Sequence, residues 1–114
     1  MDPITSLHNP KVKQARALRN RKARLETGLC LVEGIFHVGE ALAAGAAVET
    51  LFYAPDLLKS DFARGLVDQA EQLGIPCIST TPGVFASMTE KEGPQGLLAV
   101  ARVPRTPLDA LTPA

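Results

Sequence analysis

The chain of 114 residues is long enough for one domain, since a chain of this size buries about two-thirds of its unfolded surface. No apolar run approaches the roughly 18 to 20 residues that cross a bilayer, and the start lacks the pattern of a secretory leader. The net charge is zero, but residues 1–26 carry seven basic and two acidic side chains, so a basic patch precedes an acidic body.

A basic helical segment is expected over residues 9–25. Asn9 can cap free backbone donors, and the fixed φ of Pro10 suits the first helical position. Three apolar residues recur at helical spacing and form one stripe: Val12, Ala15 and Leu18. Lys13 and Arg16 fall on the opposite side. The pattern continues as a second turn or helix until Thr27-Gly28 breaks it.

Strands and helices alternate through the rest of the domain. Strands are expected at residues 29–32, 48–53, 76–79 and 97–103, the first of them buried on both faces. Helices are expected to follow at residues 35–42, 61–73 and 82–88. In the second of these, the core-facing side chains would be Phe62, Leu66, Ala70 and Leu73. The alternation predicts an α/β fold whose helices cover both faces of a largely parallel or mixed sheet.

The last eleven residues differ in character from the domain, which we place at residues 1–103. Three prolines in residues 104–114 prevent a continuous helix or central strand. This segment is therefore predicted to be a linker or an extended arm.

No catalytic or metal site is indicated. Cys30 and Cys77 lie in short apolar runs without metal-binding spacing, which favours buried structural roles and a cytoplasmic location. A pairing of Cys30 with His37 near Glu33 lacks a positioned third group that would activate a nucleophile. Neither a dinucleotide-binding glycine pattern nor a phosphate-binding P-loop is present, so no cofactor site is expected.

The basic segment predicts a polyanionic partner, because clustered Lys and Arg side chains bind phosphates by releasing condensed counterions. The candidate side chains are Lys11, Lys13, Arg16, Arg19, Arg21, Lys22 and Arg24. The alternative is a solvated helix face without a partner.

Two glycine-containing loops are further candidates. At Glu33-Gly34 a strand turns into a helix, so the N–H groups of Gly34, Ile35 and Phe36 are expected to be unpaired and able to bind phosphate oxygens. Glu33 could accept a hydrogen bond from a base or a ribose 2′-OH, or it could merely cap the helix. In the loop at residues 89–96, Gln95 and Gly96 offer polar groups and tight geometry, the alternative being a polar surface turn.

Three stretches, spread over nearly the whole chain, occur in the same order as in a known family. Residues 4–13, residues 31–42 with Leu31-Val32-Glu33-Gly34, and residues 94–100 resemble the N-terminal substrate-binding domain of SpoU/TrmH-type RNA 2′-O-ribose methyltransferases. The resemblance implies a three-layer α/β/α sandwich with a mixed four-stranded sheet, like the ribosomal proteins that bind kinked RNA. It also implies that Glu33, Gly34, Gln95 and Gly96 border an RNA-facing surface.

The resemblance further implies that the chain presents structured RNA, ribosomal or transfer, to a knotted catalytic domain. That domain would hold S-adenosylmethionine, methylate a ribose 2′-OH and mediate homodimerisation. Its motifs are absent, so residues 104–114 are expected to lead toward it, and this chain is expected to lack methyltransferase activity, cofactor, metal and membrane partners. Two alternatives remain open: a stand-alone RNA binder of the ribosomal type, and a small-molecule or protein-interaction α/β domain.

Overall fold

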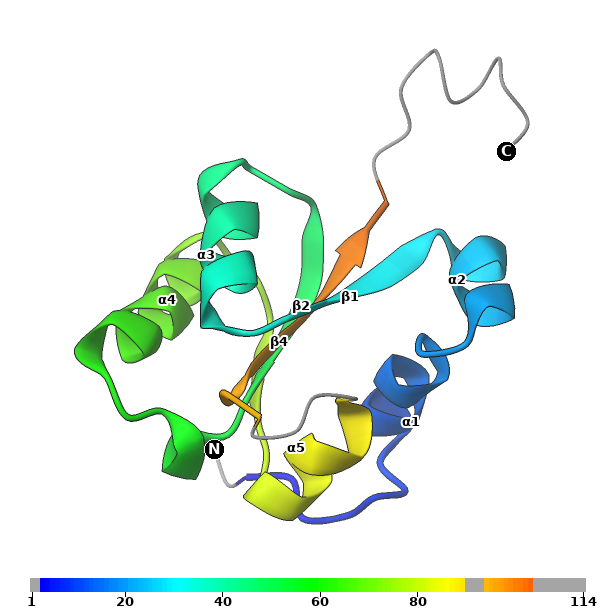
Figure 1. The fold of residues 1–114 in the computed structure, drawn as a ribbon, viewed down its shortest axis with the longest axis horizontal. Coiled ribbons are helices and arrows are strands. Elements are labelled where there is room, and N and C mark those ends of the chain that lie inside the picture. Colours follow the sequence, from blue (N-terminus) through cyan, green and yellow to red (C-terminus); the bar gives the residue numbers. More distant parts are fainter. Residues whose placement is uncertain (1–2, 90–93, 104–114) are drawn as a thin grey trace.

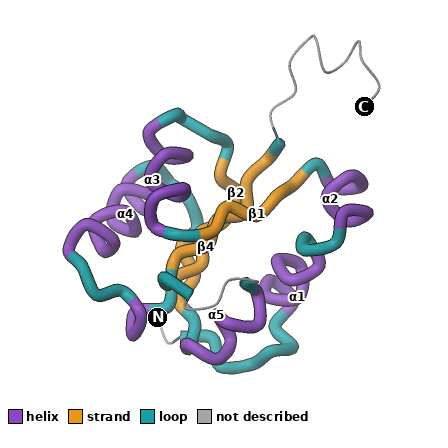
Figure 2. Tube along the Cα trace, in the orientation of Figure 1, coloured by secondary structure: helices purple, strands orange, loops and turns teal. Residues whose placement is uncertain are grey.

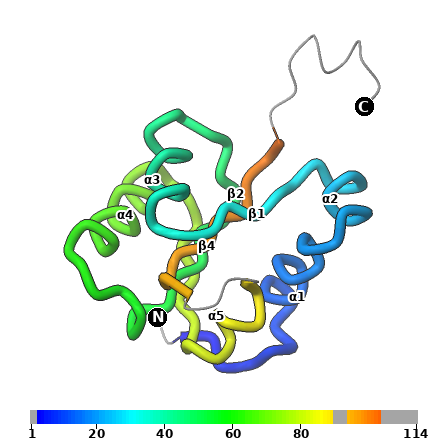
Figure 3. The backbone as a smooth tube through the Cα atoms, in the orientation of Figure 1, coloured from blue at the N-terminus to red at the C-terminus, as the bar shows by residue number. Residues whose placement is uncertain are grey.

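A computed structural model describes residues 3–89 and 94–103. The helices are α1 Pro10–Ala17, α2 Arg21–Thr27, α3 Ile35–Ala43, α4 Asp61–Gln72 and α5 Pro82–Met88, with a 3₁₀ turn at Pro55–Leu57. The strands are β1 Leu29–Glu33, β2 Val48–Tyr53, β3 Cys77–Ser79 and β4 Leu97–Arg102. Every helix and strand expected from the sequence is present, and Figure 3 shows the path of the chain through them.

The four strands form one mixed sheet in the order β1-β4-β2-β3. The last strand of the described residues, β4, lies between β1 and β2 and is antiparallel to both, whereas β2 and β3 are parallel. Figure 2 shows β4 in the centre of the molecule, between the two groups of helices. The mixed sheet is confirmed, although a single pair of strands is parallel.

Helices cover both faces of the sheet and so form three layers (Figure 1). The core between the sheet and α1, α2 and α5 is built from aliphatic side chains and two phenylalanines, Phe52 and Phe85. The core between the sheet and α3 and α4 has Val38, Leu51 and Leu66 at its centre. The predicted three-layer α/β/α sandwich is therefore confirmed.

The basic segment is divided into two short helices. In α1 the Asn9 side chain accepts hydrogen bonds from the N–H groups of Lys11 and Val12, as the sequence predicts. Asn20 caps α2 in the same way, and Gly28 ends it with φ 72°. The stripe that packs on the sheet side is confirmed, because Val12, Ala15 and Leu18 are all buried.

Two expectations about burial are wrong. Strand β1 is not buried on both faces: it lies at an edge of the sheet, and all its residues except Leu29 are half-buried. In α4, Phe62 and Leu73 are 64% and 60% exposed. The buried stripe of this helix consists of Ala63, Leu66, Val67 and Ala70. Both differences arise because the burial of a side chain depends on which elements lie next to it in space, and periodicity in the sequence does not give that order.

We expect the substitution Thr80→Val to stabilise the fold. Thr80 is 1% exposed, and its hydroxyl has no hydrogen-bond partner among the residues that the structure describes. Valine keeps the shape and removes the unpaired polar atom, so the free energy of unfolding should rise by about 1 kcal/mol in urea titrations.

The neighbouring Thr81→Val substitution is the matched control. The Thr81 hydroxyl accepts a hydrogen bond from the Val84 N–H and caps α5, so its loss should lower stability by about 1 kcal/mol. Destabilisation by both variants would contradict the account given for Thr80.

Candidate functional site

The turn between β1 and α3 is joined to Gln95, which is 60 residues away in the sequence. The Ile35 N–H donates a hydrogen bond of 2.8 Å to Gln95 Oε1, and the Gly34 N–H donates one of 3.0 Å to the Leu97 carbonyl. Gly34 has φ 95° and ψ 158°, a conformation that is open almost only to glycine. The structure thus brings together the two glycine-containing loops that the sequence singles out.

The start of α3 has fewer unpaired N–H groups than the sequence predicts. The prediction of three unpaired N–H groups is wrong for Gly34 and Ile35, because both groups donate within the fold. Within the described residues, the N–H groups of Phe36 and His37 have no acceptor. The Gln95 side chain accepts the hydrogen bond from the first N–H group of α3.

Gly96 has a structural role beneath this turn. It is buried with φ 89°, and a Cβ atom there would lie 3.0 Å from Leu57 Cβ and Leu58 Cδ2. Its carbonyl accepts a hydrogen bond from the Ala54 N–H. Gln95, in contrast, is exposed beside Gly96, so its side chain lies at the surface.

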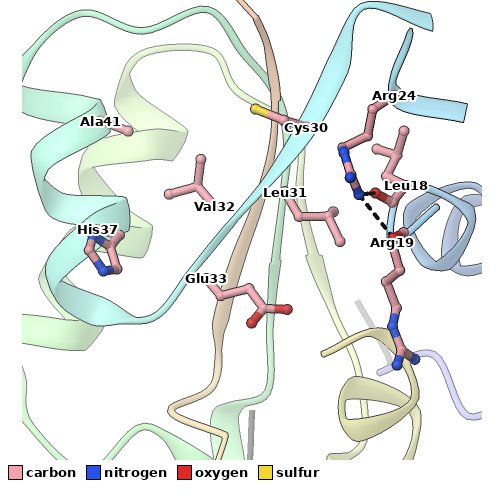
Figure 4. A pocket seen from close by; sticks show the side chains of 9 residues that line it. All are labelled: Leu18, Arg19, Arg24, Cys30, Leu31, Val32, Glu33, His37 and Ala41. Atoms are coloured by element: carbon pink, nitrogen blue, oxygen red, sulfur yellow. Dashed lines mark hydrogen bonds between the residues drawn. The ribbon is translucent and has the colours of Figure 1, made fainter. Parts of the chain in front are cut away.

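A groove of about 730 Å³ follows the outer edge of β1, and we call it the β1 groove. Nine residues line it: Leu18, Arg19, Arg24, Cys30, Leu31, Val32, Glu33, His37 and Ala41. One wall comes from α1 and α2, the other from α3, and the edge strand forms the floor (Figure 4). Glu33 points to the α1 side, so the groove connects the basic helices to the β1–α3 turn.

The predicted basic side chains do not form one uniform surface. Arg24 donates two hydrogen bonds of 2.9 Å to the carbonyls of Leu18 and Arg19, closing the end of α1 (Figure 4). Arg16 is half-buried and bonds to the Leu7 carbonyl and to Ser87 Oγ. These two guanidinium groups therefore hold the fold as well as carrying charge.

The remaining basic side chains are exposed and differ in location. Arg19 lines the β1 groove, whereas Lys11 lies in a separate hollow beside Glu49. Lys22 Nζ is 3.9 Å from a Glu26 oxygen, a weak surface pair. Lys13 and Arg21 have no side-chain bond to another described residue.

Cys30, Glu33 and His37 all line the β1 groove, but their arrangement does not support nucleophilic catalysis. His37 Nδ1 is 3.7 Å from a Glu40 oxygen, and in the described residues it makes no bond to Cys30. No group of three His, Cys, Asp or Glu side chains in residues 3–89 and 94–103 could hold a metal ion. None of the described helices has the length and apolar character that crossing a membrane requires.

The cysteines are half-buried rather than fully buried as predicted. Cys77 lies on β3, away from the β1 groove, and Sγ is 3.3 Å from the Ile75 carbonyl. Burial and, to a smaller degree, the charge of Glu71 raise the pKa of this thiol to about 11.

Sequence reasoning missed the α3 wall of the groove. His37 and Ala41 are one helical turn apart and so share a face of α3. That spacing is visible in the sequence, but the neighbouring edge strand that makes the face a wall is not. The two carbonyl bonds of Arg24 were likewise unforeseen.

We expect Gly96→Ala to destabilise the protein by about 2 kcal/mol or more, because the new Cβ would contact Leu57 and Leu58 at 3.0 Å in a strained backbone conformation. Thermal and urea unfolding would measure the loss. Gly83→Ala is the control, since a Cβ at Gly83 meets no atom within 4 Å and φ there is ordinary, so this change should be neutral or slightly stabilising.

The thiol of Cys77 should react with iodoacetamide only at high pH. In a Cys30→Ser variant the alkylation rate should rise steeply as the pH approaches about 11, rather than 9.0, the ordinary value. Because the folded pKa is raised, the contribution of Cys77 to stability is complete below pH 9 and is lost as the pH rises toward 11. A midpoint of reactivity near pH 9 would contradict the conclusion that burial and Glu71 raise the pKa of this thiol.

Comparison with known proteins gives a consistent result. Residues 9–99 match the family model of the MRM3-like substrate binding domain. The 23S rRNA (guanosine(2553)-2′-O)-methyltransferase RlmP of Bacillus subtilis (strain 168) is 32% identical over 108 residues, covering 95% of this chain and 40% of that protein.

Solved structures agree with the sequence matches. An rRNA methyltransferase from Sinorhizobium meliloti superimposes with a TM-score of 0.76 at 29% identity, over 94% of this chain and 39% of its own. The SpoU methyltransferase AviRb from Streptomyces viridochromogenes, in complex with AdoMet, gives 0.70 at 28% identity, over 93% and 37%. The chain thus spans about 40% of the length of these relatives, and its resemblance to SpoU/TrmH-type methyltransferases is confirmed.

Proposed function

Because the chain belongs to the family of MRM3-like substrate-binding domains, we propose that it binds structured RNA for a SpoU-type 2′-O-ribose methyltransferase. The observation that carries the proposal is the hydrogen bond between Ile35 and Gln95, which joins two polar loops beside a groove lined by basic helices. The names of the relatives favour ribosomal over transfer RNA as the substrate.

The groups around this turn suit a ribose-phosphate chain. Exposed lysine and arginine side chains on α1 and α2 would neutralise phosphates, and the N–H groups of Phe36 and His37 would add donors at a helix start. The Gln95 amide nitrogen can donate while its oxygen caps α3, and the Glu33 carboxylate can accept from a 2′-OH. Such an interface would position the RNA and leave the methyl transfer to other residues.

The methyl transfer itself would require a further part of the protein. We propose that residues 1–103 form the RNA-binding domain and that residues 104–114 lead to a knotted catalytic domain, since the relatives are more than twice as long as this chain. That domain would bind S-adenosylmethionine, which supplies the methyl group, and would form the homodimer. No catalytic or cofactor role is proposed for residues 1–103. We propose a cytoplasmic location, where the protein would meet its RNA.

The substitutions Lys13→Ala and Arg21→Ala test the basic surface. Each should weaken binding to a structured rRNA fragment and reduce the steepness of log K against log salt concentration by up to about one unit. The reason is that binding releases fewer counterions when one phosphate contact is missing. Fluorescence anisotropy at several salt concentrations would measure both effects. These positions are preferred to Arg16 and Arg24, whose side chains also hold the fold.

The control is Lys59→Ala, which removes the same charge from an exposed position just before α4, outside the basic helices. It should leave the affinity and the slope nearly unchanged. An equal effect of Lys59→Ala and Lys13→Ala would mean that net charge, not this surface, governs binding. Absence of RNA binding at low salt would refute the proposed function.

A further inference from the structure

The outer edge of β1 presents backbone groups to the β1 groove. The Gly34 N–H donates to the Leu97 carbonyl, and the Val103 N–H donates to the Gly28 carbonyl. In an antiparallel pair, alternate residues direct both backbone groups to the partner strand. Cys30 and Val32 therefore face β4, whereas Leu29, Leu31 and Glu33 direct their N–H and C=O groups away from it.

The open part of this edge is short. The Leu29 N–H donates to Thr27 Oγ1 at 3.2 Å, which closes one end, and the Gly34 turn closes the other. In the described residues, Leu31 then has an N–H and a C=O without a partner on the floor of the groove. A peptide that added a strand here would need several residues along β1 whose outward N–H and C=O groups are unpaired. The edge offers too few of them between the two helical walls, so it does not suit a peptide.

The chemistry of the groove instead suits one nucleotide. Adjacent donor and acceptor groups, such as those of Leu31, match the donor and acceptor on the Watson–Crick edge of a base. Leu31, Val32 and Ala41 supply apolar surface for its faces, and Arg19 brings positive charge from the turn between α1 and α2. The volume of about 730 Å³ exceeds what a base needs and is too small for a duplex.

The charge of the walls also favours RNA. Helices α1 and α2 with the turn between them carry all seven basic residues of the basic segment and one acidic residue, Glu26. The groove opens beside these helices and ends at Glu33, next to the turn assigned to RNA binding above. An RNA strand held at that turn could therefore send a nucleotide along the edge of β1.

We propose that the β1 groove holds an unpaired, unstacked nucleotide of the bound RNA, with the backbone of Leu31 bonding the base edge. This inference rests on the proposed function and adds to it a requirement for an unpaired nucleotide, which phosphate contacts alone would not impose.

Cys30 provides a reporter inside the groove, and a fully paired RNA provides the control, because the Cys77 thiol reacts too slowly below pH 9 to serve as one. The full chain is alkylated with a maleimide, without RNA, with an RNA hairpin that carries a one-nucleotide bulge, and with a fully paired RNA duplex of equal length. Mass spectrometry follows Cys30. Saturating bulged RNA should slow the modification of Cys30 about tenfold, since thiol reactivity depends on access, whereas the paired duplex should leave the rate nearly unchanged.

A matched pair of variants tests the groove independently of the turn. Ala41→Glu places a carboxylate on the α3 wall, whereas Ala43→Glu places the same charge at an exposed position of the same helix. Like charges across an interface repel, so Ala41→Glu should weaken binding of the bulged RNA about tenfold more than Ala43→Glu does. The two variants should bind the paired duplex equally, and circular dichroism would verify that both fold.

Each contrary result has its own meaning. Tight binding of bulged RNA with Cys30 fully reactive, or with equal affinities of the two variants, would overturn the groove proposal and leave the proposed function standing. Protection of Cys30 that grows with protein concentration in the absence of RNA would assign the edge to a second copy of the chain and also overturn it. Failure to bind any RNA would refute both.

Discussion

The hydrogen-bonded ladder between β4 and its two neighbours is the constraint on which the rest of the structure depends. Strand β4 follows the other three described strands in sequence, yet it lies between β1 and β2 and pairs with both. The loop that leads into β4 is thereby fixed beside the end of β1, which places Gln95 against the first turn of α3. The same insertion leaves β1 at an edge, so one interaction creates both the turn and the groove.

Much of the fold follows from the sequence. Asn9, Asn20 and Ser60 cap helices as polar residues before apolar periodic runs usually do, and Gly28 and Gly45 end helices in the left-handed conformation. These features are local, so each depends on a few neighbouring residues. For this reason the elements and their approximate bounds can be predicted one at a time.

The features that could not be predicted depend on how segments that are distant in the sequence lie next to one another in space. Periodicity indicates that a strand has apolar residues but not which strands flank it. It therefore predicts a fully buried β1, which instead lies at an edge, and a core-facing Phe62 in α4, which instead is exposed. In the site, the residue types at Glu33, Gly34 and Gln95 could be selected from the sequence, but the bond from Ile35 to Gln95 could not. The family resemblance implies RNA binding, whereas the groove depends on how three distant segments lie around the edge of β1.

The two hydrogen bonds of Arg24 have a consequence for how the basic surface can respond to a ligand. None of the side chains of α2 is buried, so this helix is attached mainly by its contacts with β1 and by Arg24, which bonds the carbonyls of Leu18 and Arg19 just after α1. Helices attached in this way can open locally at a smaller free-energy cost than the core. Because α2 carries three of the seven basic side chains, breaking the two Arg24 bonds would release part of the positive charge from its fixed position beside the sheet.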